Sequence, residues 1–259
     1  MSAPPAYPEG RGLLAGRTVL ITAAAGTGIG FATARRCAEE GARVMLSDVH
    51  ERRLREAAAA LTDVTGTPTP AALCDVSDAA AVDRLWQAAG AALGAVDVLD
   101  NNAGLGGTAA VADMTDEEWH RVLGITLTGT FYMTRAALRH MLPRGRGAIV
   151  NNASVLAWRA QAGQAHYAAA KAGVMALTRC AAVEAAPAGV RVNAVAPSLA
   201  THPHLVKVTT QEVLDRLTAR EAFGRGAEPW EVANVIVFLA SDYASYMTGE
   251  VVSVSSQHP

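Results

Sequence analysis

Tyr167 and Lys171 stand four residues apart in an Ala-rich segment that favours a helix, so both side chains lie on one helix face. An unperturbed tyrosine has a pKa of about 10 and is a poor acid–base group at neutral pH, but a neighbouring ammonium stabilises the phenolate. Ser154 precedes Tyr167 by thirteen residues and follows an apolar run, where its hydroxyl could hold a carbonyl or alcohol oxygen. Together the three residues predict proton exchange at such an oxygen. A Tyr-x-x-x-Lys pair alone is equally typical of a helix surface.

A run of glycine and alanine follows the first apolar strand and opens a helix. Small residues let the backbone turn tightly and approach a pyrophosphate, and the amides at the start of the helix point at its oxygens. A glycine cluster alone also fits a plain turn, but its position between strand and helix favours a dinucleotide site. The residues predicted to hold the cofactor here are Thr22, Ala24, Gly26, Thr27, Gly28, Ile29 and Gly30.

Asp48 follows Gly30 by eighteen residues, at the end of the next apolar run. A carboxylate at this point can accept hydrogen bonds from an adenosine ribose and repels a 2′-phosphate. Arg52 and Arg53 lie nearby and are expected at the exposed start of a helix. Asp48 therefore favours NAD over NADP, although an aspartate here also fits a helix cap.

Short β-branched runs alternate with longer Ala- and Leu-rich segments along the chain. The short runs predict strands at Thr18–Thr22, Arg43–Ser47, Thr69–Cys74, Val96–Leu99, Ala148–Asn151, Val190–Val195 and Val251–Val254. The longer segments predict helices at Ile29–Glu40, Glu51–Leu61, Ala79–Leu93, Asp116–Met141, His166–Ala186 and Trp230–Ala240. This alternation predicts a single α/β domain over residues 13–259, with a doubly wound sheet of seven parallel strands and helices on both faces.

Two segments lie outside this alternation. Residues 1–12 are rich in Pro, Gly and Ala and are predicted to be a flexible N-terminal tail. Residues 197–226 begin at the edge where open α/β sheets bind ligands and are predicted to form a substrate lid. A helix is expected within the lid at about Gln211–Glu221.

Composition excludes several classes of partner. The chain is 51% hydrophobic with a formal net charge of −2 and interspersed charges, so we expect neither nucleic acid nor a membrane surface as partner. No apolar run approaches the ~20 residues of a membrane span. The scattered cysteines, Cys37, Cys74 and Cys180, fit neither a disulfide framework nor a zinc site, and we predict no metal. These features indicate a cytoplasmic protein.

The chain resembles the short-chain dehydrogenase/reductase family over nearly its whole length. Further matching segments are Cys74-Asp75-Val76, Asn101-Asn102-Ala103-Gly104, Arg191-Val192-Asn193-Ala194-Val195-Ala196-Pro197 and Phe238-Leu239-Ala240-Ser241-Asp242. The resemblance implies an NAD(P)-binding Rossmann domain in which Tyr167 exchanges the proton and the nicotinamide the hydride. It also implies a homodimer or homotetramer that joins through Asp116–Met141 and His166–Ala186. The cofactor contacts implied outside the glycine run are Asp75, Val76, Asn102, Ala103, Gly104, Tyr167, Lys171, Pro197 and Ser198.

The chain departs from the family's pattern in four places. Ala23 and Ala24 replace the usual Thr-Gly start of the turn. Thr126 stands at the position of a catalytic Asn whose backbone carbonyl holds a relay water in the family, so we count Thr126 as catalytic. We expect its hydroxyl to bond to an earlier carbonyl of its helix and bend it. In the lid and at the C-terminus, Ser198 replaces a Gly, His202 replaces a Thr, and Ser255-Ser256-Gln257 replaces Asp-Gly-Gly.

The predicted pocket walls mix apolar surface with amides and imidazoles, which suits a bulky, partly apolar secondary alcohol or ketone. The turn, Thr126 and the Ser-Ser-Gln ending resemble a subgroup of actinobacterial enzymes of steroid-ring degradation. This resemblance implies a small-molecule substrate that is a bicyclic, CoA-linked remnant of a sterol. The predicted substrate contacts are Leu105, Gly106, Trp158, Gln164 and His202.

Two alternatives stay open. One is a 3-oxoacyl-thioester reductase, which a preference for NADPH and turnover of linear substrates would distinguish. The other is a catalytically decayed NAD-binding scaffold or sensor, which would bind NAD tightly without turning over any alcohol.

Overall fold

The computed structural model describes residues 3–202 and 210–256. Within them, seven strands are β1 (Thr18–Ile21), β2 (Arg43–Asp48), β3 (Ala71–Leu73), β4 (Val98–Asn101), β5 (Gly147–Asn152), β6 (Val190–Pro197) and β7 (Val251–Val254). They form one sheet in the order β3-β2-β1-β4-β5-β6-β7, and every pairing is parallel. The predicted fold class is confirmed. β4 begins later than predicted because the amide of Val96 donates to Nε2 of His140 rather than to a neighbouring strand.

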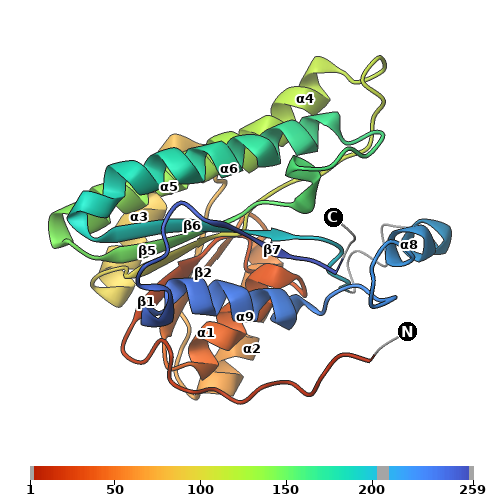
Figure 1. Ribbon diagram of the computed structural model, residues 1–259. Coiled ribbons are helices and arrows are strands. Elements are labelled where there is room, and N and C mark those ends of the chain that lie inside the picture. The colour runs from red at the N-terminus through yellow and green to blue at the C-terminus, as the bar shows by residue number, and fades with distance from the viewer. Residues whose placement is uncertain (1–2, 203–209, 257–259) are drawn as a thin grey trace.

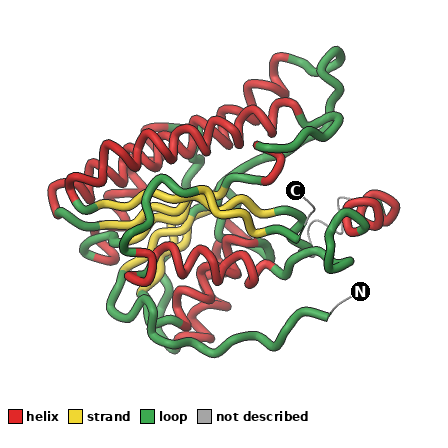
Figure 2. Tube along the Cα trace, viewed as in Figure 1, coloured by secondary structure: helices red, strands yellow, loops and turns green. Residues whose placement is uncertain are grey.

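Helices cover both faces of the sheet, as Figures 1 and 2 show. On one face lie α1 (Ile29–Glu39), α2 (Glu51–Thr65) and α9 (Pro229–Ala240). On the other lie α3 (Ala79–Leu93), α5 (Gly129–Met141) and α6 (Ala165–Ala185). Because successive strand residues point to opposite faces, Val19 and Ile21 pack toward α1 while Leu20 packs toward α3 and α5. None of the described helices is long and apolar enough to span a membrane.

The segment predicted as one helix over Asp116–Met141 is interrupted. It consists of α4 (Asp116–Leu123), a π-helical turn over Gly124–Thr128 and then α5. A capping box begins α4, since the Thr115 hydroxyl accepts from the amide of Glu118, whose carboxylate accepts from the amide of Thr115. The single-helix prediction is wrong at the π-helical turn, which holds Thr126 at its centre.

Residues 3–12, predicted to be a flexible tail, run in an extended conformation along α1 (Figure 1). The Tyr7 hydroxyl donates to Glu39 at 2.6 Å, and the Tyr7 ring packs edge-on against Trp230 of α9. The amides of Arg11 and Leu13 donate to the buried carboxylate of Glu40. The described part of this segment is therefore attached to the domain by specific contacts.

Part of the lid segment is described. α8 (Gln211–Thr218) is shorter than the predicted helix and projects away from the sheet, near the end of β7 (Figure 1). The residues that follow it return to the sheet, where Ala200 and Ala227 form a parallel bridge. Residues 203–209 of the predicted lid lie outside the described residues, as does Gln257.

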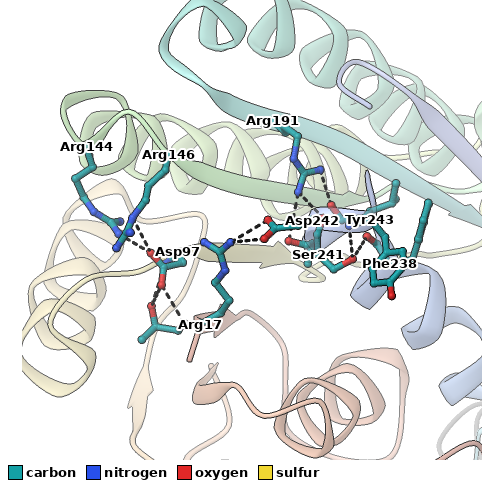
Figure 3. A network of polar contacts seen from close by, with 12 residues as sticks. Arg17, Asp97, Arg144, Arg146, Arg191, Phe238, Ser241, Asp242 and Tyr243 are labelled. Atoms are coloured by element: carbon teal, nitrogen blue, oxygen red, sulfur yellow. Dashed lines mark hydrogen bonds and ion pairs between the residues drawn. The ribbon is translucent and has the colours of Figure 1, made fainter. Parts of the chain in front are cut away.

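A polar network closes the edge of the sheet at which the strands begin (Figure 3). Asp97, just before β4, accepts from Arg144 and from the amide and hydroxyl of Thr18 in β1. Arg191 at the start of β6 donates to the last carbonyls of α9, where a cation is favoured by the helix dipole. Arg17 forms a two-pronged pair with Asp242. These charges stabilise the edge opposite the carboxyl ends of the strands.

Replacing Asp97 by Asn should lower the free energy of unfolding by roughly 1–3 kcal/mol at neutral pH, because its charged hydrogen bonds are weakened or lost. Burial acts to raise the pKa of Asp97, but hydrogen bonds from Arg144 and Thr18 outweigh it and hold the pKa below its usual range. A depressed carboxyl pKa contributes stability above the unfolded pKa, and this contribution is lost as pH falls through the folded pKa. The difference between wild type and variant in urea unfolding should therefore shrink below about pH 4. A difference independent of pH would contradict the role of the charge.

Candidate active site

A cavity of about 1510 Å³ opens at the carboxyl ends of the strands. It lies beside β1 and β4, the neighbours at which the strand order reverses, and such a reversal is where doubly wound sheets bind ligands. The glycine-rich turn after β1 lines it, and so do Ser154, Tyr167 and Lys171. The two groups predicted from separate parts of the sequence therefore share one cavity.

The backbone of the turn suits a pyrophosphate. Gly26 has φ +106, which L side chains rarely adopt, and a Cβ on Gly30 would lie 2.4 Å from the carbonyl oxygen of Ala23. Gly28 caps α1 without a side-chain hydrogen bond to the first amides of the helix. Free amides at a helix N-terminus bind anions, so these residues fit the phosphates of a dinucleotide. Ala23 itself has φ +49, a left-handed conformation that a residue with a Cβ adopts at a cost of about 1–2 kcal/mol.

Two residues predicted to contact the cofactor lie behind the turn. Ala24 is fully buried in the core, and Thr22 is 1% exposed; neither lines the cavity. The Thr22 hydroxyl accepts from the amides of Asn102 and Ala103, at 3.1 and 3.0 Å. Thr22 thus holds the loop after β4, which lines the cavity in its place.

Asp48 lines the cavity at the end of β2. Its carboxylate accepts from the amide of Ala25 at 3.1 Å and from the amide of His50 at 2.9 Å. Burial raises the pKa of Asp48, while the Ala25 hydrogen bond and the charge of Arg53 act to lower it. The carboxylate therefore braces the turn and presents negative charge at this end of the cavity.

Ser154 and Tyr167 face the cavity together. Ser154 precedes a short 3₁₀ turn (Val155–Ala157), and its hydroxyl accepts from the amide of Leu156 at 3.2 Å. Burial raises the pKa of Tyr167, and the hydrogen bond with Ser154 acts to lower it. The Lys171 ammonium lies 5.6 Å from the centre of the Tyr167 ring, where its positive charge favours the phenolate.

Lys171 is held from β4 and β5. Its ammonium donates to the carbonyl of Asn152, and a Cβ on Gly104 would lie only 3.2 Å from its Nζ. Burial lowers the pKa of Lys171 to about 8, against the attraction of Asp100. The glycine at position 104 therefore leaves the space that the ammonium occupies.

The sequence patterns did not single out Asp100. This residue of β4 is fully buried, and neither carboxyl oxygen has a hydrogen-bond partner among the described residues. Burial raises the pKa of Asp100 to about 8, against the attraction of Lys171. Its signal in the sequence is an acid directly after the apolar pair Val98-Leu99, but the strand prediction ended at Leu99.

Thr126 bonds across to a loop and not along its helix. Its hydroxyl donates to the carbonyl of Leu105 at 3.1 Å and accepts from the Leu105 amide at 2.9 Å. The expectation that it bonds to an earlier carbonyl of its own helix is wrong, because the π-helical turn presents the side chain to the loop after β4. The carbonyl of Thr126 accepts from the Thr130 hydroxyl at 2.8 Å, which uses one of its two lone pairs.

Of the remaining predicted contacts, Trp158 lies outside the cavity and the others line it. Trp158 is 51% exposed and does not line the cavity. His202 lines it from the side of the glycine turn, with Nε2 3.9 Å from where a Cβ on Gly28 would lie. The amide of Gln164 donates to the carbonyl of Gly107 at 2.6 Å and so braces the loop after β4. The other predicted residues that line the cavity are Thr27, Ile29, Asp75, Val76, Asn102, Ala103, Gly104, Leu105, Gly106, Pro197 and Ser198.

The lining residues that the sequence patterns did not single out include Arg121 of α4 and Ile125 of the π-helical turn. Both belong to helical segments whose position over the cavity depends on tertiary packing. No pattern in the sequence distinguishes them from other helix residues.

Comparisons with known proteins agree with this geometry. A family model described as enoyl-(acyl carrier protein) reductase matches residues 23–256. A Mycobacterium tuberculosis protein named (5R,7aS)-5-hydroxy-7a-methyl-1-oxo-2,3,5,6,7,7a-hexahydro-1H-indene-carboxyl-CoA reductase is 61% identical, over 100% of this chain and 99% of that protein. The chain belongs to the short-chain dehydrogenase/reductase family. It is therefore an oxidoreductase.

Other members of the family are also similar to this dehydrogenase/reductase. Cis-4-hydroxycyclohexanecarboxylate dehydrogenase of Sinomonas cyclohexanicum is 45% identical, over 92% of this chain and 94% of that protein. The crystal structure of a short chain dehydrogenase from Mycobacterium smegmatis matches with a TM-score of 0.88 and 56% identity, over 99% of both chains.

Replacing Tyr167 by Phe removes the hydroxyl and keeps the buried ring. If Tyr167 is the acid–base group, turnover should fall roughly 10²–10⁴-fold, the usual contribution of general acid–base catalysis. The dissociation constant for NADH, measured by fluorescence, should stay nearly unchanged. A variant that keeps more than about a tenth of the wild-type rate would contradict the assignment of Tyr167 as the acid–base group.

Replacing Thr126 by Val breaks both hydrogen bonds to Leu105 at nearly constant volume, whereas Thr126→Ser keeps the hydroxyl. We expect Val to raise KM about tenfold by loosening the cavity wall, and Ser to stay near wild type. Thr126→Asn, the family's residue, should stay within roughly tenfold of wild type. Equal kinetics for Val and Ser would mean that only the backbone at position 126 matters.

Proposed function

We propose that this protein is an NAD-dependent oxidoreductase that interconverts a secondary alcohol and a ketone. The observation that carries the proposal is that Ser154, Tyr167 and Lys171 line the same cavity as the glycine-rich turn. The glycine-rich turn and the loop after β4 would hold a dinucleotide whose nicotinamide would supply or accept the hydride. Ser154 donates a hydrogen bond to the substrate oxygen, and Tyr167 takes the proton from the alcohol or returns it to the ketone.

Lys171 assists Tyr167 through its charge. Its ammonium is anchored on the carbonyl of Asn152 and lies beside the phenol ring, where its positive charge stabilises the phenolate. Closure of the cavity by substrate excludes water and strengthens this interaction.

Three arguments support NAD rather than NADP. Asp48 presents a carboxylate where an adenosine ribose would lie, and its two backbone hydrogen bonds hold it there. A 2′-phosphate would meet this negative charge. The nearby Arg52 pairs with Glu56 at 2.9 Å, so its guanidinium is already partly neutralised.

For the substrate we propose a bicyclic, CoA-linked remnant of a sterol. The relative that is 61% identical over the whole chain is named as a reductase of an indene-carboxyl-CoA. The Sinomonas relative is named for a cyclohexane carboxylate, so a ring alcohol is common to both names. A 3-oxoacyl-thioester reductase has weaker support, since the FabG protein of Thermotoga maritima is 37% identical. A catalytically decayed scaffold is disfavoured because Ser154, Tyr167 and Lys171 are all present and line the same cavity.

We also propose a homodimer or homotetramer in the cytoplasm. The helices predicted to form the interface expose apolar side chains, with Phe131 40% and Val183 76% exposed. The cysteines Cys37, Cys74 and Cys180 are all free thiols, which suits a reducing compartment. Native mass spectrometry would measure the subunit number.

The activity is tested by a screen of secondary ring alcohols, linear 3-hydroxyacyl-CoA thioesters and a hydroxy-indane-carboxyl-CoA, each with NAD and with NADP. Formation of reduced nicotinamide is followed by absorbance. We expect the bicyclic thioester with NAD to give the highest kcat/KM. Preference for linear thioesters with NADP would favour the 3-oxoacyl reductase, and tight NADH binding without any turnover would favour the scaffold.

Replacing Asp48 by Ser should weaken NAD binding and narrow the gap in kcat/KM between NAD and NADP by about tenfold or more, since it removes a carboxylate that can accept hydrogen bonds from the ribose and that repels a 2′-phosphate. Asp63→Asn is a matched control that removes an exposed carboxylate near the end of α2, away from the cavity lining. Steady-state kinetics with both cofactors would measure the change. Equal use of NAD and NADP by the wild type would contradict the role of Asp48.

A further inference from the structure

Two departures from the family's pattern, Ser198 and Ser256, meet at one buried side chain, that of Glu221. Glu221 follows α8 and is only 4% exposed. Its Oε2 accepts from the hydroxyl of Ser198 at 3.1 Å and from the hydroxyl of Ser256 at 2.8 Å. Ser198 and Ser256 both stand where the family has glycine, so each supplies a hydroxyl that the usual residue lacks. The substitutions are thus linked through a shared carboxylate.

The backbone joins the same three parts of the chain. The amide of Ser198, just after β6, donates to the carbonyl of Val254 in β7 at 3.1 Å. The amide of Ala222 donates to the carbonyl of Ser256 at 2.7 Å, and the amide of Ala227 to the carbonyl of Leu199 at 2.8 Å. Glu221 therefore lies where the ends of β6 and β7 meet the segment that returns from α8.

Burial makes this carboxylate a strong constraint. Burying a charged group costs several kcal/mol of free energy unless its hydrogen-bond sites are filled. Hydrogen bonds to a charged acceptor are about twice as strong as neutral ones. The amide of Leu199 approaches Oε1 as well, at 3.4 Å. Separating the three segments would leave Glu221 without these partners, so the carboxylate favours the joined arrangement.

The joined segments form one wall of the cavity. Ser198, Leu199 and Ala200 line it after β6, and Leu217 lines it from α8. Glu221 does not line the cavity itself. Its carboxylate acts on the cavity only through the residues that it holds.

We infer that Glu221 is a positioning residue that fixes this wall and thereby determines how tightly substrate binds, with little effect on the chemical step. The inference rests on the proposed function in that the substrate occupies this cavity. The wall is carried by the residues after β6 and by α8, whereas Ser154 follows β5 and Tyr167 lies in α6. Displacement of the wall should therefore change substrate fit more than it changes the Ser154–Tyr167 pair.

The test compares Glu221→Ala and Glu221→Gln with Glu212→Gln, which removes an exposed carboxylate from α8. We expect Ala to raise the KM of the best alcohol in the screen by about tenfold or more, with kcat within about threefold. Gln keeps one carbonyl oxygen as acceptor and should recover part of the loss. The control should match wild type. Hydrogen–deuterium exchange of residues 211–226 in the ligand-free protein should be faster only in the Glu221 variants.

The exchange measurement separates this inference from the proposed function. If the wild type oxidises none of the alcohols, the proposed function fails, while unchanged exchange in Glu221→Ala would still overturn the inference. Faster exchange with an unchanged KM overturns the positioning role. Should Glu221→Ala fail to fold, Ser256→Ala removes one donor to the carboxylate at a residue that does not line the cavity. A KM for that variant equal to wild type, with exchange also unchanged, overturns the inference.

Discussion

The side chain of Asn102 connects three strands at the point where the strand order reverses. Its Nδ2 donates to the carbonyls of Thr22 and Ala23 after β1, and its Oδ1 accepts from Asn152 at the end of β5. The glycine-rich turn and the end of β5, which precedes Ser154, are therefore held in one register. Parallel strands bring their carboxyl ends together, but their carbonyls at this edge need partners, and Asn102 supplies them.

Charged side chains are paired at one edge of the sheet and buried at the other. At the amino ends of the strands, Asp97 and its arginines are paired in a network close to solvent (Figure 3). At the carboxyl ends, Lys171 and Asp100 are buried, and their charged forms are disfavoured by the loss of hydration. The first arrangement stabilises the fold. The second brings the pKa of Asp100 and of Lys171 to about 8, which suits the proposed proton transfer at this site.

Several contacts explain where prediction from the sequence stopped. The spacing of Tyr167 and Lys171 predicts that they share a helix face, but the partners of Thr126 could not be predicted. The hydroxyl of Thr126 reaches Leu105, twenty-one residues earlier, only because a π-helical turn reorients it. Likewise, Trp158 is a predicted substrate contact, but it follows a 3₁₀ turn and is exposed outside the cavity.

The sequence by itself determined the order of strands and helices along the chain, the glycine-rich turn and the residues that we propose for proton transfer, because these depend on local periodicity and on steric needs such as that of Gly30. The tertiary structure decided which side chains bond across segments: Thr22 to the loop after β4, and Glu221 to Ser198 and Ser256. Residues far apart in the chain become partners only when burial removes water as the competing hydrogen-bond partner, and burial is a property of the packed domain.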